Sequence, residues 1–408
     1  MTARGGRGLY AIVVFLIVAL LSHLLANEWP LFASKDGRRY FPALHQIGKE
    51  FGLASNTAYP DLTFFQIQPM DLIIHAPIPY SATSMDEQNS RSVSPFAHQA
   101  VESLRYRHWL GTDELGHDVL AVLLHGTVLA LLVGAGSMTI AGLIGVLLGA
   151  VAGYFGDGRL RVSRAHMILF LIGLPLACFY GFGCRYYVLL DAYRSSLILF
   201  LGQMLLSLIM GLFILFAFVA LARFLERLRL FSQYLTVPVD MLVIRMIEVL
   251  NSLPLLFLIL AIVAIAKPSL VLVVLVIGFT SWTGIARLVR AEMLRIRNLS
   301  YMEAAQALGY SPIQSIVKHA LPNLMEPVFV ALAFGFANAI LVESGLSFLG
   351  LGVPPEVLTW GALLAEARQS TSSWWLALMP GLAIFSLVYA CNNIAEVFTK
   401  RRESRVSH

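Results

Sequence analysis

The chain has 408 residues, of which 58% are hydrophobic and 13% are charged, with a formal net charge of +5. Soluble globular domains contain roughly 45–50% apolar and about 25% charged residues, so this composition indicates a membrane protein and argues against a soluble enzyme. A small positive excess is typical of basic cytoplasmic loops and gives no support for nucleic-acid binding. The three cysteines lie in apolar runs, where buried thiols are favoured over a disulfide or a metal site.

The N-terminal part combines one apolar run with one long polar section. Residues 10–26 are apolar and follow Arg4 and Arg7, and no small-residue cleavage site stands out. We therefore expect a signal-anchor helix over residues 1–27 rather than a cleaved signal peptide. Residues 28–117, called the polar segment below, carry mixed charge and several prolines, and we expect loops and short elements there.

Further apolar runs predict the remaining membrane spans. A span needs about 20 apolar residues, so the run 119–155 is too long for one simple crossing. We expect its first turns at the interface and a span over 127–154, in which Gly142, Gly145 and Gly149 suit close helix packing. The other predicted spans are 165–183, 196–221, 246–266, 269–286, 324–342 and 374–398.

The distribution of Lys and Arg predicts the orientation of these spans. Eight spans place both termini on one side, and with cytoplasmic termini most of the 29 basic residues fall in cytoplasmic segments. This bias predicts that the polar segment lies outside the membrane on the periplasmic face. The short outer loops hold only Arg185, Arg194, Lys267 and Arg368.

Residues 300–323 are a polar stretch between two apolar runs, and their local chemistry predicts two short helices, called the helix–turn–helix segment below. Ser300 and Glu303 have the spacing of a capping box that would start the first helix. The alanines that follow are strong helix formers. Gly309 falls where a left-handed C-cap residue is expected.

The second helix of this segment is predicted by Ser311 and Pro312, which suit the N-cap and the first helical position. Gln314 completes a second capping box, and Pro322 marks the next boundary. Such a segment between two spans passes no solute, but it can dock on a soluble partner and transmit that partner's motion to the helix bundle. The sequence contains no G-x-x-x-x-G-K-[ST] loop and therefore does not bind ATP by that route.

The helix–turn–helix segment resembles the EAA loop of permease subunits of binding-protein-dependent ABC importers. Its ending, His319-x-Leu321-Pro322-Asn323, is similar to the form found in the dipeptide and oligopeptide branch. In that family the loop, here residues 298–323, docks on an ATP-hydrolysing subunit. The resemblance therefore assigns coupling to the ATPase to Glu303, Ala304, Ala305, Gly309, His319, Pro322 and Asn323.

Other stretches resemble the same branch, over residues 110–157 and 238–400. His117 stands where the family usually has arginine, and Glu248 where it usually has aspartate. The polar segment is loosely similar to a subgroup with an enlarged periplasmic segment, some of whose members import peptide-like antibiotics. The matching motifs include Leu110–Val119, Leu253-Pro254, Leu346–Val353, Trp360-Gly361 and Pro380-Gly381.

The chain departs from the family pattern between residues 158 and 237, where two additional apolar runs flanked by arginines intervene. The resemblance thus implies an all-α polytopic membrane protein with a six-helix permease core and two inserted spans, eight in total. The expected domains are an anchor helix (1–27), the periplasmic polar segment (28–117), an interfacial helix with the second span (118–157), the inserted spans (158–237), the permease core (238–400) and a cytoplasmic tail (401–408).

Several ionisable residues have two interpretations each. Asp113, Glu114, His117 and Asp118 suggest a metal cluster, but a polar helix entry or gate contact at the membrane surface is favoured. Glu343 at the end of its span can contact substrate or a partner at the outer mouth, or can serve as a structural cap.

Two further residues near the expected cytoplasmic side are also ambiguous. Glu248 can line the solute path, although an ion pair with Arg245 three residues earlier is favoured. His319 can carry a proton, although capping of helix carbonyls is favoured. The arginines at 287, 290, 295 and 297 enforce the topology and can bind anionic lipid.

The resemblance implies a permease subunit of the bacterial inner membrane that imports di- or oligopeptides by alternating access. It has no catalytic residues and no cofactor of its own. ATP and Mg²⁺ would bind to two partner ATPase subunits, or one dual subunit. A second permease, a periplasmic substrate-binding protein and membrane lipid complete the expected partners, without nucleic acid. Alternatives are an importer of nickel, glutathione or a peptide antibiotic, a secondary transporter, and an intramembrane enzyme built on Asp113 and His117.

Overall fold

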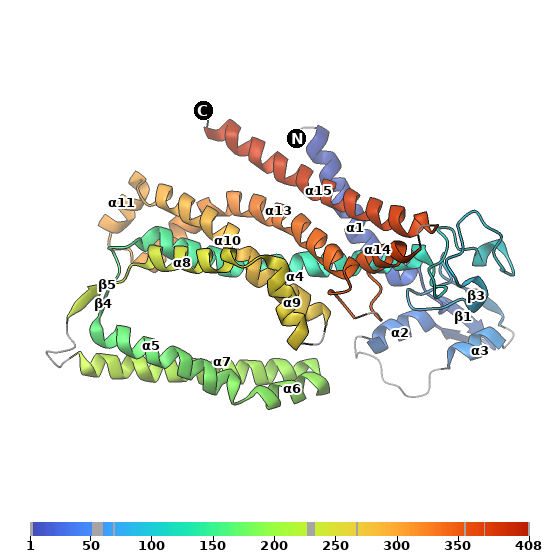
Figure 1. The fold of residues 1–408 in the computed structure, drawn as a ribbon, viewed down its shortest axis with the longest axis horizontal. Coiled ribbons are helices and arrows are strands. Elements are labelled where there is room, and N and C mark those ends of the chain that lie inside the picture. The colour runs from blue at the N-terminus through green and yellow to red at the C-terminus, as the bar shows by residue number, and fades with distance from the viewer. Residues whose placement is uncertain are drawn as a thin grey trace. The chain divides into compact units, whose positions relative to one another are not determined.

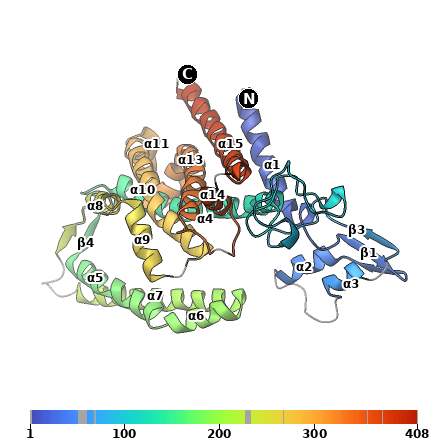
Figure 2. The ribbon, with the colours of Figure 1, turned by 45° about the vertical axis from the view of Figure 1, so that its right-hand side comes forward.

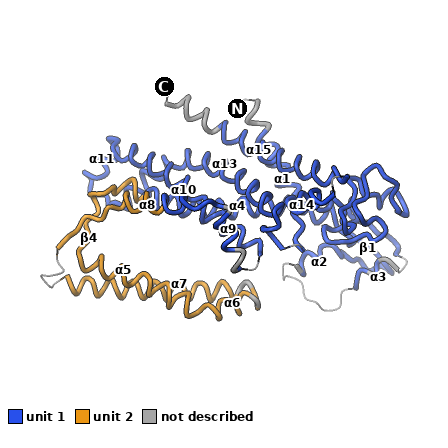
Figure 3. The backbone as a smooth tube through the Cα atoms, in the orientation of Figure 1, with its two compact units in different colours: residues 1–150, 247–408 blue, residues 151–246 orange. Residues whose placement is uncertain are grey.

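A computed structural model describes residues 3–50, 60–67, 70–226, 233–266, 268–354, 356–370 and 372–406. The described chain is mostly helical (Figure 1). It divides into two compact units, residues 1–150 with 247–408 and residues 151–246 (Figure 3). Seven helices among the described residues are long and apolar enough to cross a membrane, in agreement with an all-α polytopic protein.

Unit 1 contains five of these long helices. The helix α15 packs against both α1 and α13, and α13 also packs against α10. Figure 2 shows α1 and α15 side by side. Trp360 lies in the core between these helices and donates its indole N–H to the Leu123 carbonyl at 3.0 Å. The five helices are α1 (Ala3–Leu25), α4 (Val119–Phe155), α10 (Leu270–Ile296), α13 (Leu321–Phe348) and α15 (Trp374–Val406).

Glycines bring α4 close to its neighbours. A Cβ at Gly145 would lie 2.8 Å from the Cβ of Ile285, and one at Gly149 would lie 2.6 Å from the Ala286 carbonyl oxygen. Both contacts are with α10, whereas Gly142 approaches Leu332 of α13. The small residues therefore serve close packing as predicted, and they do so against two neighbouring helices.

The polar segment in unit 1 has short elements, as expected. Its antiparallel sheet has the strand order β2-β1-β3. The register pairs Ala33 of β1 with Tyr40 of β2 and with Ile73 of β3. The elements are β1 (Phe32–Lys35), β2 (Arg38–Tyr40), α2 (Pro42–Glu50), α3 (Leu62–Ile67), β3 (Leu72–Ile74), η1 (Glu87–Asn89) and η2 (Leu104–Tyr106).

Unit 2 contains the two inserted helices, where spans 165–183 and 196–221 were predicted. The helices α5 and α7 pack together, and Gly173 of α5 lies close against Phe218 of α7. A two-stranded antiparallel sheet of β4 and β5 joins the ends of the insertion. The elements are β4 (Arg161–Ser163), α5 (Arg164–Cys178), the π-helical turn η3 (Phe179–Gly183), α6 (Tyr186–Ser195), α7 (Leu197–Leu225) and β5 (Tyr234–Thr236).

The predicted span 246–266 is not one helix. It divides into α8 (Val239–Ser252) and α9 (Leu255–Ile265), with the break at Leu253 and Pro254. Pro254 has no backbone N–H and stands at the N-cap of α9, so it ends the preceding helix. The count of eight spans is therefore not confirmed among the described residues, which hold seven candidates.

Candidate functional site

The first helix of the helix–turn–helix segment, α11 (Ser300–Ala307), ends at a glycine as predicted. Gly309 has a φ of +82°, which suits a residue without a Cβ. Its N–H donates to the Gln306 carbonyl at 3.0 Å, and the Tyr310 N–H donates to the Ala305 carbonyl at 3.1 Å. These two bonds form a Schellman motif, which turns the chain sharply towards the second helix.

The predicted capping box at Ser300 is wrong. The N-cap of α11 is Leu299, and no side chain caps this end of the helix. The Leu299 carbonyl accepts the backbone N–H groups of Met302 and Glu303, at 2.8 and 3.3 Å. Ser300 is therefore the first residue of α11 and not its N-cap, and the Glu303 side chain remains exposed.

The second helix, α12 (Pro312–Ser315), begins with the predicted capping box. The Gln314 N–H donates to the Ser311 Oγ at 3.3 Å, and the Ser311 N–H donates to the Gln314 Oε1 at 3.0 Å. A π-helical turn, η4 (Ile316–Ala320), then leads into α13, with Pro322 in the first turn of α13. The second helix is thus continuous with a long apolar helix instead of being a separate short element.

The helix–turn–helix segment has one buried and one exposed face. Met302, Ala305, Ser315 and Ala320 are buried. By contrast, Leu308, Ile313 and Val317 are 79%, 72% and 54% exposed, and they are called the apolar patch below. Of the other residues assigned to coupling, Glu303, Ala304, Pro322 and Asn323 are exposed as well. An apolar patch at a solvent-exposed turn is typical of a docking surface.

A side-chain hydrogen bond fixes the helix–turn–helix segment to α13. The Asn323 amide donates to the Tyr301 hydroxyl at 3.1 Å and to the His319 carbonyl at 2.9 Å. The His319 ring meets the Tyr310 ring edge-on at 5.2 Å, and its buried Nε2 has no hydrogen-bond partner among the described residues. Carbonyl capping by Nε2 of His319 is therefore not observed, and the ring packs under the turn instead.

Asp113 and His117 form a local cap in the polar segment. The Asp113 Oδ1 accepts the N–H groups of Leu115 and His117, at 3.0 and 2.7 Å. Its Oδ2 lies 2.5 Å from the His117 Nδ1. Asp113 is fully buried, so it stabilises the loop that precedes α4 and does not face open space.

Asp118 caps the N-terminus of α4 and also takes part in a buried charge network. Its Oδ1 accepts the Ala121 N–H at 2.7 Å, and its Oδ2 lies 2.9 Å from the His108 Nδ1. The His108 Nε2 lies 3.2 Å from the Asp86 Oδ2, and the Tyr80 ring stacks on the imidazole at 4.3 Å. Burial alone would lower the pKa of His108, but Asp118 and Asp86 together raise that pKa above its ordinary value.

Glu343 and Glu248 lie in different surroundings. Glu343 is 3% exposed and accepts hydrogen bonds from Ser347 and Ser344, at 2.8 and 3.3 Å. Because α13 continues to Phe348, Glu343 lies inside this helix and not at its end. Glu248 is exposed on α8, as is Arg245 three residues earlier, so the ion pair with Arg245 and the solute path both stay predictions for Glu248.

His108 and Asp86 complete the buried network with Asp118, and the sequence does not predict their role. No local pattern could reveal them, because Asp86 and Asp118 lie 22 and 10 residues from His108. Glu366 in α14 (Trp360–Gln369) is likewise not predicted by any sequence pattern. Burial, followed by the charge of Asp113, raises the pKa of Glu366 to about 7.

Residues 230–404 match the family described as "Binding-protein-dependent transport system inner membrane component". The chain therefore contains the permease domain of this family over these residues. It is therefore a multi-pass protein of the inner membrane and the membrane component of an ABC transporter. Permeases of this family work with ATPase and substrate-binding partners and hold no ATP site of their own.

Three relatives show how far the similarity extends. The chain is 28% identical over 390 residues to the inner membrane ABC transporter permease protein YejE of Escherichia coli, covering 94% of this chain and 89% of the relative. It is 24% identical to the peptidoglycan transport system permease protein YejE of Agrobacterium fabrum, covering 98% and 91%. It is 29% identical to the di/tripeptide transport system permease protein DppC of Pseudomonas aeruginosa, covering 72% and 70%.

Proposed function

We propose that this permease is one subunit of an ABC importer that moves di- or oligopeptides into the cytoplasm by ATP-driven alternating access. The observation that carries the proposal is the apolar patch of Leu308, Ile313 and Val317, exposed on a helix–turn–helix that is capped at both of its turn-facing ends. An ATPase subunit would cover this patch on the cytoplasmic side, with the polar segment in the periplasm.

The connection to α13 explains how motion at the patch would reach the membrane. The chain is helical from Pro312 through the π-helical turn to Phe348, and Asn323 links the start of α13 to Tyr301 of α11. Displacement of α11 and α12 by a closing ATPase therefore moves α13 as a connected body. Two ATPase subunits, or one dual subunit, would bind ATP and Mg²⁺, and a second permease would complete the pathway.

The relatives support a peptide substrate, delivered by a periplasmic binding protein. One relative is named as a di/tripeptide permease. A second candidate substrate is a peptidoglycan fragment, because a relative named for peptidoglycan transport aligns with 98% of this chain, including the polar segment. Both candidates are short peptide-containing solutes, so the same coupling scheme applies to each.

The coupling role is tested by placing a charge on the apolar patch. We expect Ile313→Asp to abolish co-purification with the ATPase and ATP-dependent uptake of a radiolabelled tripeptide into proteoliposomes, because a buried unpaired carboxylate opposes docking. The matched control is Leu104→Asp, which changes a residue that is 75% exposed in the polar segment, whereas Ile313 is 72% exposed. Normal uptake by Ile313→Asp would contradict the proposal.

The substrate is tested in the same proteoliposomes, with the binding protein present. Uptake of a labelled tripeptide and of a labelled peptidoglycan-derived muropeptide would be compared at equal concentration. Faster tripeptide uptake supports the peptide proposal. Uptake of the muropeptide alone would favour the second candidate and overturn the first.

A further inference from the structure

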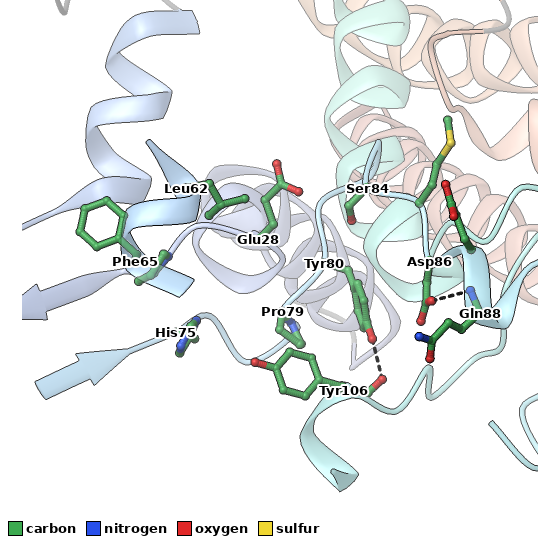
Figure 4. Close-up of a pocket in the computed structure, with 13 residues that line it drawn as sticks. Glu28, Leu62, Phe65, His75, Pro79, Tyr80, Ser84, Asp86, Gln88 and Tyr106 are labelled. Atoms are coloured by element: carbon green, nitrogen blue, oxygen red, sulfur yellow. Dashed lines mark hydrogen bonds between the residues drawn. The ribbon is translucent and has the colours of Figure 1, made fainter. Parts of the chain in front are cut away.

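The polar segment contains a cavity of about 450 Å³ (Figure 4). Its walls come from the chain after α1, from α3, and from the loop around Pro79 to Gln88. A neighbouring cavity of about 700 Å³ shares residues of its wall, so the two are adjacent, and together they are called the groove below. The shared residues are Phe65, His75, Tyr80, Asp86, Gln88 and Tyr106.

The charged lining of this groove is acidic. Glu28, Asp86 and Glu87 line the first cavity, and Glu102 lines the second. No Lys or Arg is found among the described residues that line either cavity. Burial, followed by the charge of Arg105, lowers the pKa of His75, so this imidazole adds no positive charge at neutral pH. A positively charged ligand would therefore meet favourable electrostatics beside these carboxylates.

Glu28 is the acidic residue of the first cavity whose carboxylate is partly buried without a counter-charge among the described residues. It is half-buried, and its carboxylate makes no hydrogen bond or ion pair with any residue that the structure describes. Burial raises the pKa of Glu28 because the charged form loses water without gaining a counter-charge. A cation in the cavity would supply this missing counter-charge. Asp86, by contrast, already has His108 beside it.

Aromatic side chains complete the walls. Phe65 is 4% exposed and packs edge-on against Trp29 at 6.5 Å, which holds its ring at the cavity wall. The Tyr80 hydroxyl donates to the Tyr106 carbonyl at 2.7 Å and is therefore already occupied. Aromatic faces beside carboxylates attract ammonium and guanidinium groups through the negative face of the ring.

We propose that this groove binds an organic cation, through a primary ammonium or guanidinium group that pairs with Glu28 and lies against the aromatic wall. Asp86 lines both cavities and is linked through His108 to Asp118, the N-cap of α4. An occupied groove is thus connected by side chains to the first residues of a long apolar helix. The binding site does not depend on the transported solute. The identification of the cation as a basic side chain of a transported peptide rests on the proposed function, whereas the binding of an organic cation does not.

The site is tested by calorimetric titration of the purified full-length chain in detergent. The probe is N-acetyl-glycyl-arginyl-glycine amide, and the control probe replaces arginine by citrulline, which has a similar shape but no charge. We expect the arginine probe to bind and the citrulline probe to bind at least about tenfold more weakly, because hydrogen bonds between charged groups are the strong ones.

Two variants separate the site from general electrostatics. Glu28→Gln should weaken binding of the arginine probe by about tenfold or more, since it removes the carboxylate that would pair with the cation. Asp61→Asn removes an exposed acid of the polar segment that does not line the groove, and it should bind like the original chain. Both variants should keep the elution profile and melting temperature of the original chain.

Three results would overturn the inference. They are equal binding of the arginine and citrulline probes, unchanged binding by Glu28→Gln, and no binding of the arginine probe at millimolar concentration. None of these results bears on docking of the ATPase at the apolar patch. Failure of the cation site and failure of the proposed transport function are therefore distinguishable.

Discussion

His108 holds two carboxylates together inside the polar segment, so its replacement by glutamine is a sensitive perturbation. The side chains of His108, Asp118 and Asp86 are 0%, 2% and 20% exposed. The backbone of His108 is held separately, because its N–H and carbonyl both bond to the Gln99 side chain, at 2.8 and 2.9 Å. His108→Gln therefore removes the positive charge while the chain around it keeps its own hydrogen bonds.

The expected cost follows from the burial of the three side chains. Removing one partner from a buried charge pair costs about 3–5 kcal/mol, and hydrogen bonds to charged groups contribute about 1.5–3 kcal/mol. Water can partly solvate Asp86, and the glutamine amide can donate one hydrogen bond to either carboxylate. We therefore expect a loss near the lower figure, about 3 kcal/mol, which corresponds to roughly a hundredfold change in a local opening equilibrium.

The assay is hydrogen–deuterium exchange of the full chain, read from peptides that cover residues 80–118. We expect roughly a hundredfold loss of protection in His108→Gln, because opening of this segment exposes its backbone amides. The control is His98→Gln, since His98 is an exposed histidine of the same segment. Equal protection in the two variants would refute the idea that the buried imidazolium stabilises the polar segment.

The same network predicts a pH dependence. The pKa of His108 is raised above the ordinary value of 6.5, since Asp118 and Asp86 outweigh the effect of burial. The stability from its charge is therefore fully present below pH 6.5 and is lost as the pH rises through the folded-state pKa. After correction for intrinsic exchange rates, protection should fall over this range in the original chain and stay constant in His108→Gln. A rise in protection with pH would contradict the sign.

Three further predictions concern the helix contacts. Gly149→Ala should lower the melting temperature, because its Cβ would lie 2.6 Å from a backbone oxygen of α10. Gly284→Ala is the control, because its Cβ meets no described atom within 4 Å; helix propensity should raise its free energy of unfolding by about 0.5–1 kcal/mol, and its melting temperature with it. A lower melting temperature in both variants would contradict the packing argument. Burial raises the pKa of Glu366 to about 7, so stability should fall as pH rises from 4.5 to 7, and Glu366→Gln should remove this trend in thermal scans. Trp375→Phe should cost about 1–2 kcal/mol in unfolding experiments, since it leaves the buried Thr112 carbonyl without the indole N–H at 3.1 Å.

Local features of the helix–turn–helix segment were predictable because they depend on neighbouring residues. The positive φ of Gly309 and the capping box of Ser311 and Gln314 both rest on hydrogen bonds within one turn. The prediction of a capping box at Ser300 is wrong because it depends on residues that precede the segment. Whether Ser300 caps or enters the helix depends on where α10 ends, and Leu299 occupies the cap position.

The membrane spans were predicted to the extent that hydropathy alone determines them. Apolar runs showed where helices are stable in lipid, and the two inserted helices lie where such runs were found. Hydropathy carries no information on a helix break, so it predicts one span over 246–266 although the helix is interrupted at Pro254. It also does not tell which helices meet, and Gly142 and Gly149 proved to contact different partners.

By itself, then, the sequence determined the class of protein, most of its long helices, the caps of the helix–turn–helix segment and its resemblance to a permease. Only the tertiary structure decided which acids are paired. Asp118, for which the sequence allows a gate contact or a metal ligand, is joined through His108 to Asp86. Glu28, beside a cavity, has no such partner among the residues that the structure describes. The physical reason is that charge pairing and burial depend on residues brought together by the whole fold, whereas helix caps and hydropathy act over one or a few turns of chain.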